Sequence, residues 1–312
     1  MNAIICQLVN DGFFQIESVL FKNLTLAFCL MIVLPSCNEE KAIYSKNSSS
    51  NIITEQLMKS LSQSIPSDKI IHRATLTPGG DSFYITLSDY DFTNFDIQIA
   101  NIRGDSIFKL TATTINSNEH DDHGLSFSPS ENSVYFSSTR PRSEQDTSYQ
   151  WAIWKSEGKG ESWTEPRHIP IHNLKNKHVS HPSITRDGVL YFHSSDLDYS
   201  NMHIYRTESI DHKYREAKKV VFPTYFTSGT CTPYISPNED NVIFASIGTQ
   251  LDLYRCSSFI DNEWKDCNIM SGQINKNGLG NPSVSIDENK LFYTTGTYDF
   301  TEKWKVKFTA LE

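Results

Sequence analysis

Six side chains that can bind ions or hydrogen-bonding ligands recur at equivalent points of an internal repeat in this sequence. They are His72, Arg73, His123, His181, Thr232 and Asn281. Imidazole can bind an anion or a metal ion, and it can titrate near neutral pH. No three of these residues have a fixed metal-ligand spacing. We therefore predict a ligand-binding site without a metal or another cofactor; the alternative is a set of hydrated polar groups that bond to the backbone.

The six residues lie one or two positions before the copies of a short pattern, of which Leu125-Ser126-Phe127-Ser128-Pro129 is one. The five copies occupy residues 74–78, 125–129, 182–185, 233–237 and 282–285. The Ser or Thr at the fourth position returns every 49 to 57 residues. A repeat of this length is typical of a solenoid, a propeller or another repeat array.

Each copy is followed by signals for three more strands. A turn rich in Pro, Gly, Asp and Asn leads into a second strand such as Val134-Tyr135-Phe136-Ser137. A third strand centres on Gln98 in the first copy and on aromatic residues in the others, which are Trp154, Tyr205, Tyr254 and Trp304. A fourth strand carries Phe108, Trp163, Tyr214 and Trp264. Four short aromatic and β-branched strands in about 50 residues form one propeller blade.

The strand count predicts how the ring closes. The sequence contains five first, second and third strands but only four aromatic fourth strands, so we expect residues 52–71 to supply the missing outer strand. The predicted fold is therefore all-β, a five-bladed β-propeller closed by an N-terminal strand. A six-bladed ring is the alternative. Because first strands line the channel of a propeller, the six side chains should meet at one channel mouth.

The second copy carries a family resemblance. The segments Ser126-Phe127-Ser128-Pro129, Val134–Ser138, Ile153–Ser156 and Ser162–Pro166 together resemble the TolB-type, WD-like propeller repeat of bacterial envelope proteins. The resemblance covers about residues 71–312. It implies a propeller fold in a family that includes binding platforms, periplasmic partners of transport systems and, more remotely, polysaccharide lyases. The turns at residues 79–81 and 287–289 depart from the usual turn of the repeat.

Residues 1–37 predict a lipoprotein signal peptide with an atypical N-terminal extension. The apolar run 24–34 is too short to span a bilayer, and it ends at Leu34-Pro35-Ser36-Cys37, which resembles the bacterial lipobox. We predict acyl chains such as palmitate on Cys37, a flexible tether at 38–51 and a propeller domain at 52–312. The predicted location is the bacterial cell envelope, anchored to the outer membrane on its periplasmic or surface side. The alternative is a buried strand or helix with an incidental cysteine.

Three cysteines remain in the predicted mature domain. An exported protein can keep disulfides, and Cys256 and Cys267 flank a turn that can pair them. A different register, with Tyr254 opposite Trp264, would separate the two cysteines. Cys231 is predicted to be a buried free thiol.

The charge balance restricts the partners. With 28 Lys and Arg against 37 Asp and Glu, and no basic run, the chain lacks the clustered cations that nucleic acid requires. We predict a monomeric, non-catalytic binding platform for a protein or glycan at the channel face. The alternative is a carbohydrate-active enzyme, a polysaccharide lyase or glycoside hydrolase, that uses the His and Arg site. Catalysis would need an acidic, Tyr or Lys group within reach of His123 and His181, and no catalytic pair of carboxylates is identified.

Overall fold

The structure, a computed structural model, describes residues 53–159, 162–211, 213–226, 229–248 and 250–311. The chain divides into two compact units, residues 1–40 and 41–312, and all described residues belong to the second. The predicted signal peptide, Cys37 and the tether lie outside the described residues. Within the described ranges, no helix is long and apolar enough to cross a membrane.

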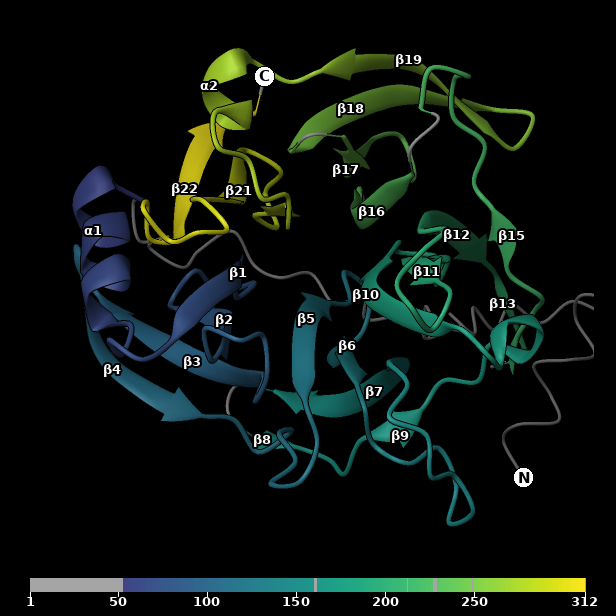
Figure 1. Cartoon of the computed structure of the whole chain (residues 1–312), viewed down its shortest axis with the longest axis horizontal. Coiled ribbons are helices and arrows are strands. Elements are labelled where there is room, and N and C mark those ends of the chain that lie inside the picture. The colour runs from purple at the N-terminus through teal and green to yellow at the C-terminus, as the bar shows by residue number, and fades with distance from the viewer. Residues whose placement is uncertain (1–52, 160–161, 212, 227–228, 249, 312) are drawn as a thin grey trace, which may run out of the picture. The chain divides into compact units, whose positions relative to one another are not determined.

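Five antiparallel sheets, called blades 1 to 5 in chain order, surround a central axis (Figure 1). Blade 1 contains β1 (Ile70–Leu76), β2 (Ser82–Ser88), β3 (Asp96–Arg103) and β4 (Ser106–Ala112). Blade 2 contains β5 (Asp122–Phe127), β6 (Ser133–Ser138), β7 (Ala152–Lys159), β8 (Ser162–Trp163) and β9 (Arg167–His168). Blade 3 contains β10 (His178–Ile184), β11 (Leu190–Ser195), β12 (His203–Thr207) and β15 (Lys218–Lys219).

The last two blades follow the same order. Blade 4 contains β16 (Thr230–Ile235), β17 (Val242–Ile247), β18 (Leu251–Ile260) and β19 (Glu263–Ile269). Blade 5 contains β20 (Ser283–Val284), β21 (Lys290–Thr295) and β22 (Lys305–Ala310). Outside the blades lie a hairpin, β13 (Ser209–Ile210) and β14 (Lys213–Tyr214), and the helices α1 (Glu55–Ser64), η1 (His172–Leu174) and α2 (Gly272–Asn275). The prediction of an all-β, five-bladed propeller is confirmed, and the six-bladed alternative is wrong.

The Ser or Thr that marks each repeat closes the turn between the first and second strands. In blade 2 the hydroxyl of Ser128 accepts the N–H of Glu131, and its own N–H donates to the carbonyl of Ser133. In the other four turns the hydroxyl of the anchor accepts the N–H, and the N–H of the anchor donates to the carbonyl, of one and the same residue; these anchors are Thr77, Thr185, Ser236 and Ser285. A small side chain with a hydroxyl is required here because it satisfies backbone groups that the turn leaves unpaired.

The segment predicted to be an outer strand is instead the helix α1, which corrects the predicted closure by an N-terminal strand. Apolar residues at Ile53, Leu57, Met58 and Leu61 lie on one helical face. Thr54 caps the helix, since its hydroxyl accepts the N–H of Leu57 at 3.1 Å. The apolar face packs against both neighbouring blades, including Ile102 of blade 1 and, in blade 5, Phe292 and Val306. The helix therefore covers the edge that a fourth strand of blade 5 would have covered (Figure 1).

Hydrogen bonds from the first two strands of blade 5 to the first strand of blade 1 also close the ring. Ser283 of blade 5 donates to the carbonyl of Ala74 of blade 1, 209 residues away in sequence. Thr294 of blade 5 donates to the carbonyl of His72 at 2.6 Å, across 222 residues. The first and last blades are thus joined directly at the channel, as neighbouring blades are elsewhere, for example through the bond from Thr75 to the carbonyl of Leu125.

Strand register corrects two aromatic assignments. Tyr214, predicted on the fourth strand of blade 3, lies in the hairpin strand β14, and the fourth strand is β15. Phe136, Phe192 and Phe244 each lie opposite the predicted aromatic of the third strand, but the partner of Phe292 in blade 5 is Phe308. Trp304 lies just before β22, beyond the paired segment. The side chain of Trp304 is therefore available to the channel mouth instead of the space between blades.

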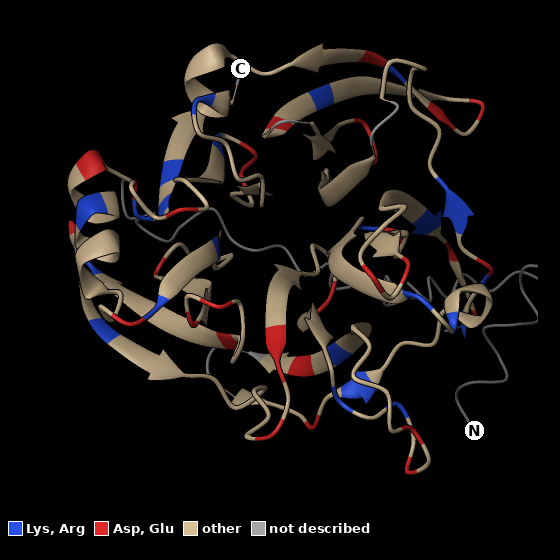
Figure 2. Cartoon of the chain, in the orientation of Figure 1, with Lys and Arg blue, Asp and Glu red and all other residues tan. Residues whose placement is uncertain are grey.

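The structure pairs Cys256 and Cys267 in a disulfide between β18 and β19, where the two residues are direct cross-strand partners. Trp264 is opposite Phe259 in this register, so the alternative that placed it opposite Tyr254 does not occur. Cys231 is buried and has a free thiol. Most charged residues lie on outer strands and loops (Figure 2).

Candidate functional site

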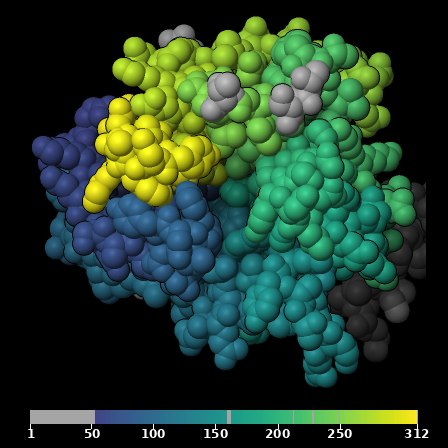
Figure 3. Space-filling view, viewed as in Figure 1, coloured from purple at the N-terminus to yellow at the C-terminus, as the bar shows by residue number. Residues whose placement is uncertain are grey.

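All six residues singled out in the sequence line one cavity of about 840 Å³. The cavity lies where the first strands begin, and a much smaller one of about 50 Å³ lies where those strands end. The space-filling view shows a hollow where the blades meet (Figure 3). Besides the six, the cavity is lined largely by aromatic and histidine side chains, which include Phe92, Phe95, Tyr149, Trp151, His178, His193, Tyr199, Tyr298 and Trp304.

Backbone bulges bring these side chains to the channel. The pairing of the first and second strands shifts at the predicted positions in blades 1 to 4. The equivalent residues of blades 2 to 5 have positive φ angles, which are 68° at Gly124, 55° at His181, 47° at Thr232 and 56° at Asn281. A bulge bends its strand and re-aims the side chain. The repeat thus places one position of each blade at the channel.

Side chains of the preceding blade hold these bulges in place. The bonds are from Gly124 N–H to Thr86 Oγ1, from His181 N–H to Ser137 Oγ and from Thr232 N–H to His193 Nδ1. Asn281 N–H donates instead to Thr232 Oγ1 at 3.4 Å. Both the N–H and the hydroxyl of Thr232 are therefore used within the ring, which makes Thr232 a positioning residue at the cavity wall.

A hydrogen-bond chain fixes the tautomers of two histidines. His193 Nδ1 accepts the N–H of Thr232 at 3.1 Å, so in the neutral ring the proton lies on Nε2, which donates to Ser180 Oγ at 2.9 Å. Ser180 then donates to Nδ1 of His181 at 2.9 Å. The proton of neutral His181 consequently lies on Nε2, which makes that nitrogen a hydrogen-bond donor at the cavity.

The central histidines form a column in which the ring of His181 stacks on that of His193 and meets that of His123 at a tilted angle. The ring of His181 lies 4.4 Å from that of His123 and 4.7 Å from that of His193, and His123 contacts Trp151 at 4.1 Å. Burial lowers the pKa of His193 to about 3 and holds the pKa values of His123 and His181 well below their ordinary range. The imidazoles therefore contribute neutral donors and acceptors at pH 7, and no positive charge.

His72 lies on the neighbouring part of the cavity wall, where Phe95 contacts the rings of both His72 and His123. Ser88 donates its hydroxyl proton to the carbonyl of Asp89, so the 2.7 Å contact between His72 Nε2 and Ser88 Oγ is a bond from the imidazole N–H. Burial lowers the pKa of His72 to about 3. The ring packs against Phe95 at 4.8 Å and Trp304 at 5.0 Å.

Arg73 is the one buried cation among the described residues that line the cavity. Its side chain is 3% exposed, and it borders both the large cavity and the small one at the other end of the channel. Nε and Nη1 are buried without a hydrogen-bond partner among the described residues. Burial lowers the pKa of Arg73 to about 10, so the group is still charged at pH 7.

A repeated loop at the rim of the cavity was not predicted from the sequence. It joins the second and third strands in blades 1, 3 and 5, at residues 89–94, 196–201 and 297–302. Each copy has Asp at its third position, an aromatic residue at its fourth and Ser or Thr at its fifth. The aromatic residues have positive φ angles, which are 63° at Phe92, 64° at Tyr199 and 57° at Phe300. Such angles are strained for bulky side chains and concentrate at functional sites.

Internal hydrogen bonds maintain this strained conformation. The Asp at the third position accepts the hydroxyl at the fifth, as in the bond from Thr93 to Asp91 at 2.6 Å and its two counterparts. In blades 1 and 3 the first residue is also Asp, and it binds a lysine that precedes the first strand. The repeat of this six-residue pattern was the available sequence signal for the rim.

The rim loops and Trp304 form an aromatic wall. The Trp304 ring contacts Phe92 at 5.5 Å, Tyr298 at 5.6 Å and Phe300 at 6.1 Å. On the far side of the mouth, Tyr199 stacks on His178 at 4.5 Å. Phe92, Tyr199 and Tyr298 are 40%, 58% and 59% exposed, so their rings are accessible to a ligand.

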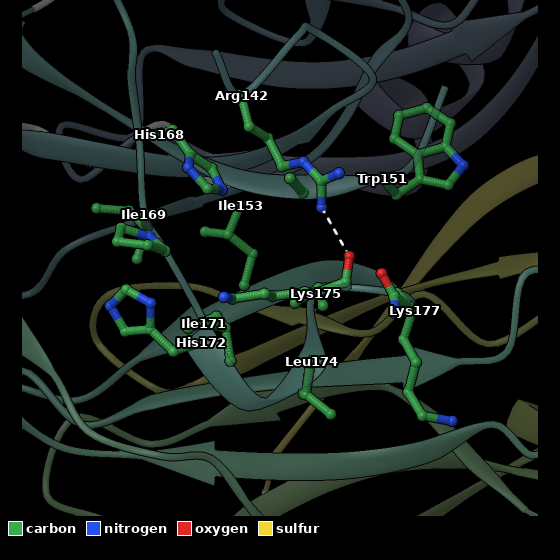
Figure 4. A pocket seen from close by; sticks show the side chains of 14 residues that line it. Arg142, Trp151, Ile153, His168, Ile169, Ile171, His172, Leu174, Lys175 and Lys177 are labelled. Atoms are coloured by element: carbon green, nitrogen blue, oxygen red, sulfur yellow. Dashed lines mark hydrogen bonds between the residues drawn. The ribbon is translucent and has the colours of Figure 1, made fainter. Parts of the chain in front are cut away.

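A second cavity of about 370 Å³ has a different character (Figure 4). Among its three Lys and Arg side chains, Lys175 is exposed, while Arg142 and Lys177 are each paired with a carboxylate, Asp146 and Asp196 respectively. Arg142 also donates to the carbonyl of Lys175 at 3.0 Å, as the dashed line in Figure 4 shows. Arg142 and Lys177 are therefore both paired in this cavity, whereas Arg73 in the channel cavity has no carboxylate partner among the described residues.

Metal binding and catalysis would each require particular partners for the channel histidines. Within the described ranges, no group of three His, Cys, Asp or Glu side chains is placed to hold a metal ion. The ring of His123 contacts Phe95, Trp151 and His181, and no carboxylate, Tyr or Lys is hydrogen-bonded to it among the described residues. The acidic, Tyr or Lys partner that catalysis at His123 would need is therefore not found at hydrogen-bond distance in this part of the chain.

Solved structures share the fold. A GH43 endo-arabinanase from Bacillus licheniformis has a TM-score of 0.51 at 14% identity, over 80% of this chain and 96% of that one. A thermostable family-43 glycoside hydrolase has a TM-score of 0.52 at 13% identity, over 80% and 92%. TolB from Acinetobacter baumannii has a TM-score of 0.45 at 16% identity over 81% of this chain, which spans only 53% of that chain. No family model and no curated protein matches the sequence. At these identities the likeness shows a β-propeller.

Proposed function

We propose that this protein is a non-catalytic binding protein of the bacterial cell envelope that holds a glycan in the channel cavity. The observation that carries the proposal is the cavity of about 840 Å³ whose wall combines exposed aromatic rings with neutral imidazoles. This volume is typical of sites for small ligands, in which a few polar groups fix the orientation of a ligand held by apolar contacts. A sugar ring has apolar C–H faces and hydroxyl edges, which match the two kinds of lining.

The strained rim favours a glycan, rather than a flat protein surface, as the ligand. Three aromatic residues at positive φ cost of order 1–3 kcal/mol each, and this cost persists only where the surroundings impose the conformation. The rings of Phe92 and Tyr199 line the mouth of the concave site, and Phe300 packs against Trp304 of the same wall. A glycan that enters the cavity would contact the aromatic side chains of the rim along the length of the sugar chain. The membership of a TolB-type envelope family, inferred from the repeat, is part of this proposal.

Replacing Phe92 or Tyr199 with Gly is expected to weaken glycan binding by about tenfold or more while leaving the melting temperature unchanged or higher. Loss of an aromatic anchor commonly costs about 2 kcal/mol of binding, and glycine adopts positive φ without strain. Binding is measured by calorimetry with hits from a glycan array. Phe108→Ala is the matched control, because Phe108 is 49% exposed on the outer strand β4. Equal affinities in all three variants would contradict the rim as a binding surface.

The envelope location rests on the lipobox-like Leu34-Pro35-Ser36-Cys37. We expect Cys37→Ala to abolish incorporation of labelled fatty acid and to release the protein from the membrane fraction. Several buried acyl chains hold a protein firmly to a bilayer, so their loss removes the anchor. Cys231→Ala, which replaces a buried thiol of the propeller, is the control and should leave labelling intact. Unchanged labelling of the Cys37 variant would remove the anchor from the proposal.

A further inference from the structure

The unpaired guanidinium of Arg73 identifies a property of the ligand. A buried charge is costly unless it is paired and hydrogen-bonded, and native proteins rarely leave one without partners. Arg73 is 3% exposed, and neither Nε nor Nη1 has a partner among the described residues. Elsewhere in the described chain, the partly buried Arg140 is bonded to the buried carboxylate of Asp122 at 2.6 Å. The arrangement at Arg73 therefore has a cost that a structural role does not explain.

The surroundings of Arg73 supply no compensating negative charge. Asp121 is the one carboxylate among the described residues that line the cavity, and its Oδ1 accepts the N–H of Phe95. The histidines nearest the channel are neutral, so they add no charge that would strongly attract or repel an anion. His181 adds an N–H donor at Nε2, since its Nδ1 accepts from Ser180. The cavity thus presents one cation and several hydrogen-bond donors.

We propose that Arg73 binds an oxyanion group of the ligand, a carboxylate or a sulfate ester carried by an acidic sugar. This inference rests on the glycan-binding function proposed above and specifies the class of glycan. The planar guanidinium can donate two parallel hydrogen bonds to such a group. The oxyanion pairs with the buried charge in the channel, while the sugar ring lies against the aromatic wall around Trp304. The acidic group is then the deepest part of the bound ligand, because Arg73 lies between the two cavities.

The test compares the full chain with its Arg73→Gln variant in calorimetric titrations. The probes are an oligosaccharide of hexuronic acids, the same oligosaccharide with its carboxyl groups reduced to alcohols, and a sulfated neutral oligosaccharide. We expect an acidic probe to bind the parent at least about tenfold more tightly than the reduced one, and Arg73→Gln to remove that preference. Arg103→Gln is the control, since Arg103 is exposed on β3 against Phe108. Equal binding of acidic and reduced probes by the parent overturns the inference and leaves glycan binding intact.

A second measurement does not depend on any sugar. Acetate and sulfate should raise the melting temperature of the parent more than that of Arg73→Gln. Without added anion, Arg73→Met should melt at a higher temperature than the parent, because it removes an unpaired buried charge. If no oligosaccharide binds while the anion effect requires Arg73, the glycan function fails and the oxyanion site stands. A lower melting temperature for Arg73→Met, or anion effects that are equal in both proteins, would overturn the site.

Discussion

Leu57→Ala is expected to lower the free energy of unfolding by about 3 kcal/mol, within the range of about 2–5 kcal/mol for truncating a fully buried leucine. Leu57 is 0% exposed and belongs to the cluster that joins α1 to blades 1 and 5. The substitution leaves a cavity at the one place where a helix replaces a strand. Because the ring closes there, the loss should reach both neighbouring blades and not α1 alone.

Urea unfolding followed by tryptophan fluorescence measures this change. Lys59→Ala is the matched control, since Lys59 is exposed on the same helix and its replacement alters no core contact. The control should shift the unfolding free energy by about 0.5 kcal/mol or less. A change below about 1 kcal/mol for Leu57→Ala would show that α1 is not part of the closed core.

Acidification from pH 7 to pH 5 is expected to destabilise the fold by about 2 kcal/mol for each histidine that is held neutral in the channel. Burial lowers the pKa of His193 to about 3, whereas an unfolded histidine titrates near 6.5. Between these values the unfolded chain binds more protons than the folded one. Stability is therefore complete above about pH 6.5 and is lost as the pH falls toward 3. His123, whose pKa burial also holds well below its ordinary range, adds a second loss of the same sign.

Asp122 acts in the opposite direction over part of this range. Burial raises the pKa of Asp122 to about 6, so on acidification the folded state takes up a proton before the unfolded state does. Protonation of Asp122 therefore stabilises the fold by about 1 kcal/mol between pH 7 and pH 5. The net loss from His72, His193 and Asp122, whose pKa values are about 3, 3 and 6, is still about 3 kcal/mol, and His123 and His181 add losses of the same sign. Urea unfolding at a series of pH values measures it, and His193→Asn, which keeps a donor and an acceptor, should flatten the curve by about 2 kcal/mol. A stability that does not change between pH 7 and pH 5 would contradict the neutral column of histidines.

The repeat predicted the fold because the hydroxyl at each anchor position has a structural role within its own turn. A hydroxyl at Ser128 and its equivalents closes the turn within a few residues of itself, so the signal is local and recurs in every blade. The six channel residues were predicted in the same way. A residue at a fixed distance in sequence from the anchor occupies the same place in every blade, and therefore the same place relative to the central axis of the propeller. The structure places all six at one cavity, while their role in binding stays a prediction.

The helix α1 was missed because a missing strand was expected where the sequence has a helical pattern. The spacing of Ile53, Leu57, Met58 and Leu61 and the cap at Thr54 were both visible in the sequence. The rim loops were missed because the repeat was aligned on strands, and the loops occur only in blades 1, 3 and 5. The isolation of Arg73 could not be predicted, since it depends on which side chains of all the other blades reach the channel.

The hydrogen bonds from Ser283 and Thr294 to blade 1 have a consequence for how the chain acquires its fold. They join residues separated by 209 and 222 positions, so they form only after nearly the whole domain is available. Contacts of such high sequence separation slow folding, because the entropy of a long loop is lost before the contact forms. Each blade can assemble from neighbouring segments, whereas the contacts of blade 1 and α1 with blade 5 wait for the end of the chain. A chain delivered from its N-terminus onward would therefore leave one side of blade 1 exposed the longest, with Leu57, Met58 and Leu61 covered by blade 1 alone until β22 arrives.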